Sequence, residues 1–203
     1  MQADGRTVVC HNGVELAAAW ADASVDTALL PGDVLVQDED WAGYALPVIR
    51  STNLTILGTA GRMPTLDFNY VEKKAMLTNG TTLTLRRVVV LGTQDSVFVR
   101  DVDLDLLWPL PAGQQAVLWL DGGAIVTPIC KPLSEAWPPG VPGGVNVYEF
   151  PVPLPPTCDP GAASPLDRCY LWSYRCVDVV TLGSEVTANG TAMPTGYVVG
   201  GHP

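Results

Sequence analysis

The chain consists largely of short apolar runs, each closed by Gly, Pro, Asn or Asp. From residue 25 onward most runs are three to six residues long, and Leu or Ile alternates with Thr, as at residues 54–57 and 82–85. Alternation at a period of two is typical of strands that bury one face. The pattern predicts strands over residues 27–30, 34–36, 47–49, 54–57, 65–68, 75–77, 82–85, 88–91, 97–102, 116–120 and 124–126.

One segment near the N-terminus has the spacing of a helix instead. Asn12 is suited to cap its first turn, and Glu15, three residues later, completes a capping box. We therefore expect a short helix over residues 14–22. Its expected apolar face consists of Val14, Ala17, Ala18 and Ala21.

The strand-like runs recur in similar surroundings. Residues 50–58 and 78–86 both read as a polar turn followed by alternating Leu, Ile and Thr, and Leu-Gly-Thr or Leu-Gly-Ser recurs at residues 57–59, 91–93 and 182–184. A loose repeat of this kind, with several short strands in each period, predicts a β-solenoid. A β-sandwich is the alternative, but its strands are usually longer than these.

The second half contains a proline-rich interruption. Residues 128–165 hold 11 of the 18 prolines, which predicts an extended loop because proline cannot donate to a strand ladder. Within it residues 145–150 alternate and could form one edge strand, and strand character returns at residues 169–176 and 177–182. Gly200-Gly201 indicates a flexible end. The predicted division is 1–24 for the N-terminal segment and helix, 25–127 for β coils, 128–165 for the insert, and 166–203 for a further coil.

This order of segments resembles a known fold family. A helix at residues 14–22 is followed by Leu-Leu-Pro-Gly-Asp-Val at 29–34, Asn-Leu-Thr-Ile-Leu-Gly at 53–58 and Thr-Leu-Thr-Leu at 82–85. It resembles the start of right-handed parallel β-helix domains of the pectin-lyase-like superfamily, in particular those in secreted or cell-surface proteins of green algae, over roughly residues 8–127. The resemblance implies an all-β, right-handed parallel β-helix whose first helix covers the N-terminal end. The Arg-x-Pro-x-x-Arg motif of pectate lyases is missing from the sequence, which argues against lyase activity.

Charge and hydropathy exclude several classes of protein. With 21 acidic and 11 basic residues the net charge is −10, so neither nucleic acid nor an anionic membrane surface is an expected partner. No apolar run is long enough to insert in a membrane. Residues 1–6 contain no apolar core of a signal peptide, so the chain either stays inside the cell or is part of a secreted protein.

Two features favour the secreted interpretation. Three of the six asparagines, Asn53, Asn79 and Asn189, lie in Asn-x-Thr glycosylation sequons, although such triplets could also belong to the turn-and-strand repeat. Five cysteines form no CxxC pair, so zinc is not expected. The four that surround the insert are the disulfide candidates, with unassigned connectivity, and Cys10 is the expected free thiol. These candidates are Cys130, Cys158, Cys169 and Cys176.

One constellation could carry chemistry. On a strand, Asp101, Asp103 and Asp105 would project from one face as acid–base groups or Ca²⁺ ligands. The interpretation that we favour is a solvated acidic strand. Only two histidines occur, both near the ends, which argues against a Ser-His-Asp or Cys-His site.

The aromatic residues offer a binding hypothesis, because Trp and Tyr stack on sugar rings and anchor interfaces. We expect most of them to pack the insert against the helix and only Trp137 to face a partner. The aromatic residues concerned are Trp41, Tyr44, Trp108, Trp119, Trp137, Trp172 and Tyr174.

The sequence thus predicts a secreted or cell-surface glycoprotein domain with a non-catalytic structural or adhesive role. Its expected partners are other extracellular glycoproteins, copies of itself, or glycans. An unpaired coil expected near Gly200 would need further chain or another subunit to cover it. One alternative is a polysaccharide lyase or hydrolase, the only case in which a cofactor, Ca²⁺, is expected. Another is a receptor ectodomain that binds carbohydrate or peptide.

Overall fold

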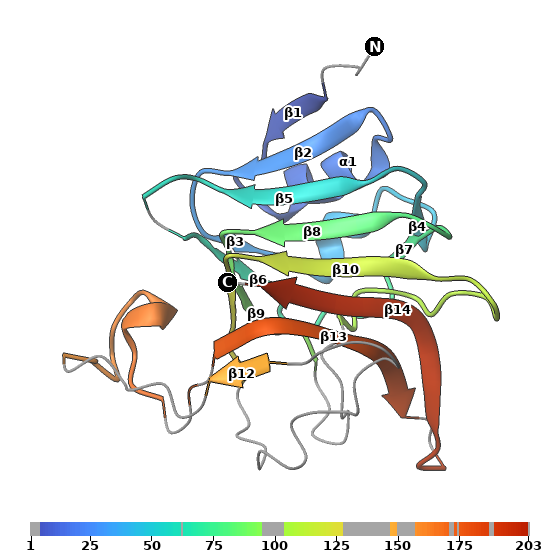
Figure 1. Ribbon diagram of the computed structural model, residues 1–203. Helices are drawn as coiled ribbons and strands as arrows, with labels where there is room; N and C mark the ends of the chain where they lie inside the picture. The colour runs from blue at the N-terminus through green and yellow to red at the C-terminus, as the bar shows by residue number, and fades with distance from the viewer. Residues whose placement is uncertain are drawn as a thin grey trace.

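The computed structural model describes residues 5–61, 63–94, 104–127, 147–149, 157–170, 173, 175–186 and 189–202. In these residues the chain is mostly strands, with one α-helix and two short 3-10 helices (Figure 1). The expected all-β class is therefore confirmed at the level of a largely β protein.

Most elements of the first 127 residues lie where the apolar runs predicted them. The helices are α1 (Gly13–Ala21), η1 (Asp38–Trp41) and η2 (Pro165–Asp167). The strands are β1 (Arg6–Val9), β2 (Val25–Leu30), β3 (Val34–Leu35), β4 (Val48–Arg50), β5 (Leu54–Gly58), β6 (Thr65–Asp67), β7 (Ala75–Leu77), β8 (Thr82–Arg86), β9 (Val89–Leu91), β10 (Ala116–Asp121), β11 (Ala124–Ile125), β12 (Val147–Glu149), β13 (Arg175–Val186) and β14 (Ala192–His202). The strand expected over residues 97–102 falls outside the described residues.

The strands form three sheets. Sheet A has the order β1-β2-β5-β8-β10-β14-β13-β12, sheet B the order β11-β9-β6-β3, and sheet C pairs β4 with β7. Between β2 and β5, and again between β5 and β8, the chain visits sheet B and then sheet C, and we call each such passage a level. Every strand pair described within residues 25–127 is parallel, whereas a β-sandwich is built from antiparallel pairs.

Alternation decides which side chains enter the interior. Leu54 and Ile56 of β5 are buried, as are Leu83 and Leu85 of β8, while the threonines between them point outward. In the register of sheet A, Leu54 lies beside Leu83 and Ile56 beside Leu85, so identical positions stack from level to level. Each fully buried side chain of this kind contributes about 1.5–3 kcal/mol to stability.

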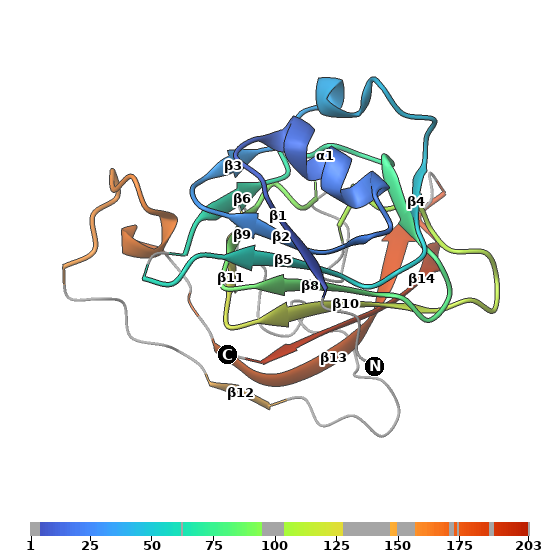
Figure 2. The ribbon, with the colours of Figure 1, turned by 90° about the horizontal axis from the view of Figure 1, so that it is seen from above.

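Helix α1 lies across the N-terminal end of the sheets (Figure 2). Asn12 caps it as predicted, with its Oδ1 accepting from the Glu15 N–H at 2.9 Å, but the Glu15 carboxylate accepts from His11 N rather than from Asn12 N. The predicted apolar face is only partly correct: Ala17 is buried and Ala21 is partly buried against the core, but Val14 is 57% exposed and Ala18 is also exposed. Leu16 and Trp20 occupy the buried face instead, since these larger side chains remove more apolar area from water.

Arg50 of β4 ties this helix to the sheets from inside. Its side chain is fully buried, and within the described part of the chain its guanidinium donates to backbone carbonyls. Burial lowers the pKa of Arg50, while the Asp26 and Asp22 carboxylates act in the opposite direction, and an arginine remains charged in either case. The carbonyls at the end of α1 carry the negative end of the helix dipole, which favours a cation there. The acceptors are the carbonyl oxygens of Ala19, Trp20, Asp22, Val25, Thr52 and Asn53.

Polar side chains connect successive levels at the turns between strands, which we call corners. The Asp33 carboxylate, just before β3, accepts from the N–H of Thr65, the first residue of β6, at 2.8 Å. The amide oxygen of Asn53, just before β5, accepts from the N–H of Thr82, the first residue of β8, at 2.9 Å. Asn79 repeats this contact one level later, accepting from Gln115 N at 2.9 Å. Each bond satisfies a backbone donor that leaves the ladder at a corner.

The C-terminal part of the chain corrects two expectations. Gly200 and Gly201 lie inside β14, which pairs in parallel with β10 and antiparallel with β13, so neither the flexible end nor the unpaired coil near Gly200 is found. A Cβ on Gly201 would lie 2.6 Å from the carbonyl oxygen of Leu120, so the close approach of β10 needs glycine here. The edge strand expected over residues 145–150 is confirmed by β12. The strand expected over residues 177–182 lies inside β13, and among the described residues that follow the insert no strand begins before Arg175.

Candidate functional site

The predicted acidic row is described only at its last member. Asp105 lies in a turn rather than on a strand; its N–H donates to the Thr93 carbonyl at 2.9 Å and its carbonyl accepts from Lys73 N at 2.7 Å. Asp101 and Asp103 lie outside the described residues. Among the residues that the structure describes, no three His, Cys, Asp or Glu side chains are grouped so that they could hold a metal ion.

The three sequon asparagines are exposed. In Asn53 and Asn79 the amide oxygen holds the corner bond to the next level, and in Asn189 it accepts from Thr191 N at 3.2 Å. A glycan is attached to the amide nitrogen, so these bonds are compatible with glycosylation. They also give Asn53 and Asn79 a structural role, which was the alternative explanation of the triplets.

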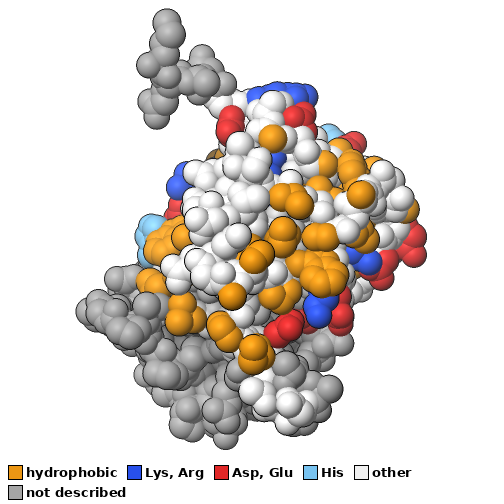
Figure 3. Space-filling model, turned by 90° about the vertical axis from the view of Figure 1, so that its right-hand side faces the viewer, with side chains coloured by type: hydrophobic (Ala, Val, Ile, Leu, Met, Phe, Trp, Pro, Cys, Tyr) orange, Lys and Arg blue, Asp and Glu red, His pale blue; other side chains and the backbone are white. Residues whose placement is uncertain are grey.

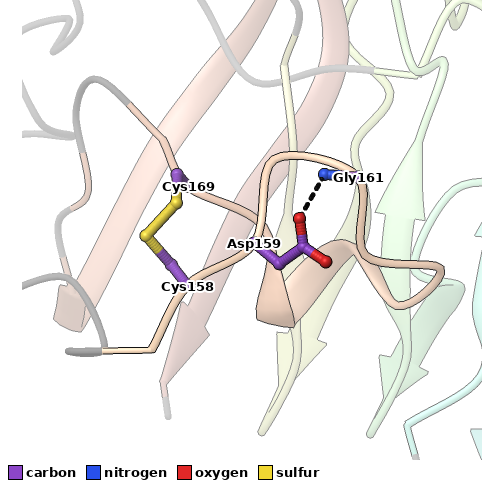
Figure 4. The surroundings of a disulfide bond; sticks show 4 residues. All are labelled: Cys158, Asp159, Gly161 and Cys169. Atoms are coloured by element: carbon purple, nitrogen blue, oxygen red, sulfur yellow. Dashed lines mark hydrogen bonds between the residues drawn. A yellow bond between two sulfur atoms is a disulfide. The ribbon is translucent and has the colours of Figure 1, made fainter.

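The cysteines follow the expected division where they are described. Cys158 and Cys169 form a disulfide that closes a loop around η2, and within this loop the Asp159 carboxylate accepts from Gly161 N at 2.9 Å (Figure 4). Cys10 is buried and free, as predicted. Cys130 and the side chain of Cys176 lie outside the described residues, so their pairing stays a prediction.

The aromatic side chains do not share one environment. Trp41 is buried against Trp20 of α1, with ring centroids 6.4 Å apart, whereas Trp108 is 41% exposed beside sheet C. Trp119 is half-buried on the outer face of sheet A, and Tyr44 is also half-buried. Trp137, Trp172 and Tyr174 lie outside the described residues.

The outer face of sheet A carries a row that the sequence did not reveal. Arg86 ends β8, Asp121 ends β10 and His202 ends β14, and the register places the three side by side (Figure 1). One oxygen of Asp121 accepts from Arg86 Nε at 2.5 Å, and the other lies 3.7 Å from His202 Nε2. The side chains of Arg86 and His202 are each 52% exposed, and that of Asp121 is 20% exposed. The row therefore offers solvent a guanidinium, a carboxylate and an imidazole together.

Trp119 completes this arrangement one position earlier in β10. Its register partner in β14 is Gly200, which has no side chain, so the indole can extend toward His202, and their ring centroids lie 5.5 Å apart. On the other side its partner is Thr84, followed in line by Thr55 and Thr27. Trp119 thus places a flat ring next to a charged row and a row of hydroxyls. We call Arg86, Asp121, His202 and Trp119 the sheet A site.

Comparison of the chain with protein-family models, with curated proteins and with solved structures gives no match. In the described part of the chain, no helix has both the length and the apolar character needed to cross a bilayer.

Proposed function

We propose that this chain is a non-catalytic adhesive module of an extracellular or cell-surface glycoprotein assembly, folded as a right-handed parallel β-helix. Parallel pairing in all three sheets of residues 25–127, and the repeated passage from sheet A to B to C, support the β-helix. The disulfide and three exposed sequons support an extracellular location.

The observation that carries the adhesive role is the sheet A site. A pyranose ring has an apolar C–H face that stacks on an indole and a rim of hydroxyls that need donors and acceptors. Trp119 supplies the ring, and Asp121 and Arg86 supply an acceptor and donors next to it. The threonine line of β2, β5 and β8 would extend the polar surface for a longer glycan chain.

The charge of the site favours neutral sugars. Arg86 and Asp121 compensate each other at 2.5 Å, and the chain as a whole carries a net charge of −10, which repels polyanions. The row contains a single carboxylate, whereas the common glycosidase mechanisms use two flanking the scissile bond. We therefore assign this site to binding and not to hydrolysis.

The test is binding to insoluble cellulose, xylan, mannan and β-1,3-glucan, with soluble polygalacturonate as the acidic comparison. We expect retention on at least one neutral polysaccharide, weakened about tenfold or more by Trp119→Ala and by Asp121→Asn, and much less by Trp119→Phe. Trp108→Ala, which alters sheet C, is the matched control and is expected to bind normally.

Three results would overturn the proposal. They are no retention on any neutral polysaccharide, retention unaffected by both Trp119→Ala and Asp121→Asn, and release of reducing ends that depends on Asp121. Circular dichroism confirms that each variant folds, and if Trp119→Ala does not fold, Asp121→Asn decides.

A further inference from the structure

A small pocket lies at the end of sheet A, next to the sheet A site. Its walls are Thr59, Gly61, Met63 and Arg87, and its volume is about 180 Å³. It lies where β5 and β8 end, at the left of the view in Figure 1, whereas Figure 3 shows the opposite side of the molecule, where hydrophobic side chains gather. Pockets that hold whole small ligands measure about 300–1,000 Å³, so this one has room for a single substituent of a larger ligand.

Arg87 occupies a corner position that is suited to glycine. It directly follows β8, and Gly122 directly follows β10, whose last residue Asp121 is the register partner of Arg86. The two backbones also bond alike: the Arg87 N–H donates to the Asp121 carbonyl at 2.9 Å, and the Gly122 N–H donates to the His202 carbonyl at 3.0 Å. Both have left-handed backbones, with φ of 53° for Arg87 and 60° for Gly122. Glycine adopts this conformation freely, whereas other residues are strained in it, and such strain gathers at ligand-binding sites.

The Arg87 guanidinium is available to a ligand. The residue is exposed, and in the described part of the chain no acidic side chain pairs with it, whereas Arg86 is paired with Asp121. Thr59 adds a hydroxyl to the lining, and Met63 adds an apolar side chain that is 38% exposed. A guanidinium binds a carboxylate or a sulfate through two parallel N–H bonds. The pocket therefore suits one small oxyanion attached to an apolar carbon.

We propose that this pocket binds a single carboxylate or sulfate group carried by the glycan that the sheet A site holds. The two adjoin, because Arg87 lies one residue beyond the row of Arg86, Asp121 and His202. The net charge of −10 repels polyanions, so the ligand is a mainly neutral chain with isolated acidic groups and not an acidic polymer. This inference rests on the adhesive function proposed above and specifies its ligand further.

Isothermal titration calorimetry tests the acidic group. Oligosaccharides of xylose and of glucose are compared unsubstituted, with one glucuronate side group, and with one sulfate group. We expect one of the two anions to raise the affinity about tenfold, which is typical of one hydrogen bond to a charged group, and the form that shows the gain identifies the anion.

Two variants separate the pocket from the overall charge. Arg87→Gly suits the left-handed backbone, so it is expected to melt no lower than the wild type and to lose the gain in affinity. Arg6→Gln is the matched control, because it removes the same charge from exposed β1, and it is expected to keep the gain. Equal affinity for all three forms, or a gain that survives Arg87→Gly, would overturn the proposal.

An NMR titration of Arg87 itself distinguishes this proposal from the adhesive function. Sodium glucuronate or a sulfated glucose should shift the Arg87 Nε–H signal, which is the signal that Arg87→Gly removes, whereas glucose should not. The Arg6 signal should stay in place. The experiment needs no stacking on Trp119. Absence of a shift with both anions would refute the pocket even if neutral glycans are retained, and a shift without such retention would support the pocket and refute only the adhesive function.

Discussion

Arg50 provides the sharpest test of how α1 is attached to the sheets. Its three nitrogens bind different carbonyl groups: Nη1 donates to those at the end of α1, Nη2 to those of Val25 and Asn53, and Nε to that of Thr52. A lysine keeps the charge but concentrates its donors on one atom. It therefore reaches one of these groups of carbonyls and abandons the others.

The size of the effect follows from which carbonyls are buried. Arg50→Lys that keeps the bonds to α1 leaves the buried Val25 carbonyl without a donor, at a cost of about 1–3 kcal/mol. Arg50→Met also abandons the buried carbonyls of Ala19 and Trp20, which raises the cost to about 3–9 kcal/mol. Domains of this size are stable by only about 5–15 kcal/mol, so Arg50→Met is expected to lose a large part of its stability.

Urea unfolding followed by tryptophan fluorescence measures these differences. The free energy of unfolding should fall in the order wild type, Arg50→Lys, Arg50→Met. Arg86→Met is the control, because its half-exposed ion pair with Asp121 is worth at most about 1 kcal/mol. An unfolding midpoint of Arg50→Met equal to that of wild type, or equal losses for Lys and Met, would refute the reasoning.

Three further predictions concern single positions. Gly58→Ala should lower the thermal unfolding midpoint sharply, because its Cβ would lie 2.0 Å from the Arg87 carbonyl oxygen. Gly32→Ala is the control and should leave the midpoint unchanged, because no atom lies within 4 Å of its Cβ; equal effects would contradict this. Burial raises the pKa of Cys10 to about 11, so iodoacetamide at pH 8 should label Cys10 only after the chain is unfolded. Peptide mass spectrometry measures the labelling, and fast labelling of Cys10 in the folded chain would disprove this prediction. In unglycosylated protein, Asn53→Ala should cost about 1 kcal/mol and Asn53→Asp, which keeps the corner acceptor, much less; equal denaturation midpoints would argue against the corner bond.

Period-two alternation was sufficient to locate most strands, because each short run has its own inward and outward positions. Residues 75–77 were predicted with the observed bounds, and residues 54–57 and 82–85 within one residue of them. β14 was missed because its glycines and Pro194 carry no apolar alternation. β1 was missed because its residues are mostly exposed, so no buried face marks the segment.

The sheet A site could not be predicted from spacing. Arg86, Asp121 and His202 are far apart in sequence, and they meet only because each ends a strand in the same register. That register depends on the lengths of the loops between levels, which local alternation does not encode. The prediction of the buried face of α1 was partly wrong for a related reason. The side of α1 that is buried depends on the sheets below it, and burying Trp20 removes more apolar area from water than burying a small alanine.

In the corner bonds between levels, the acceptor is always synthesised before the donor. Asp33, Asn53 and Asn79 each precede the backbone N–H that they accept from, and in every case the donor belongs to a later part of the chain. During synthesis the acceptor therefore leaves the ribosome first, and each new stretch of polypeptide meets a template that is already in place. Folding that proceeds from the N-terminal end, with α1 already in place, would use this polarity.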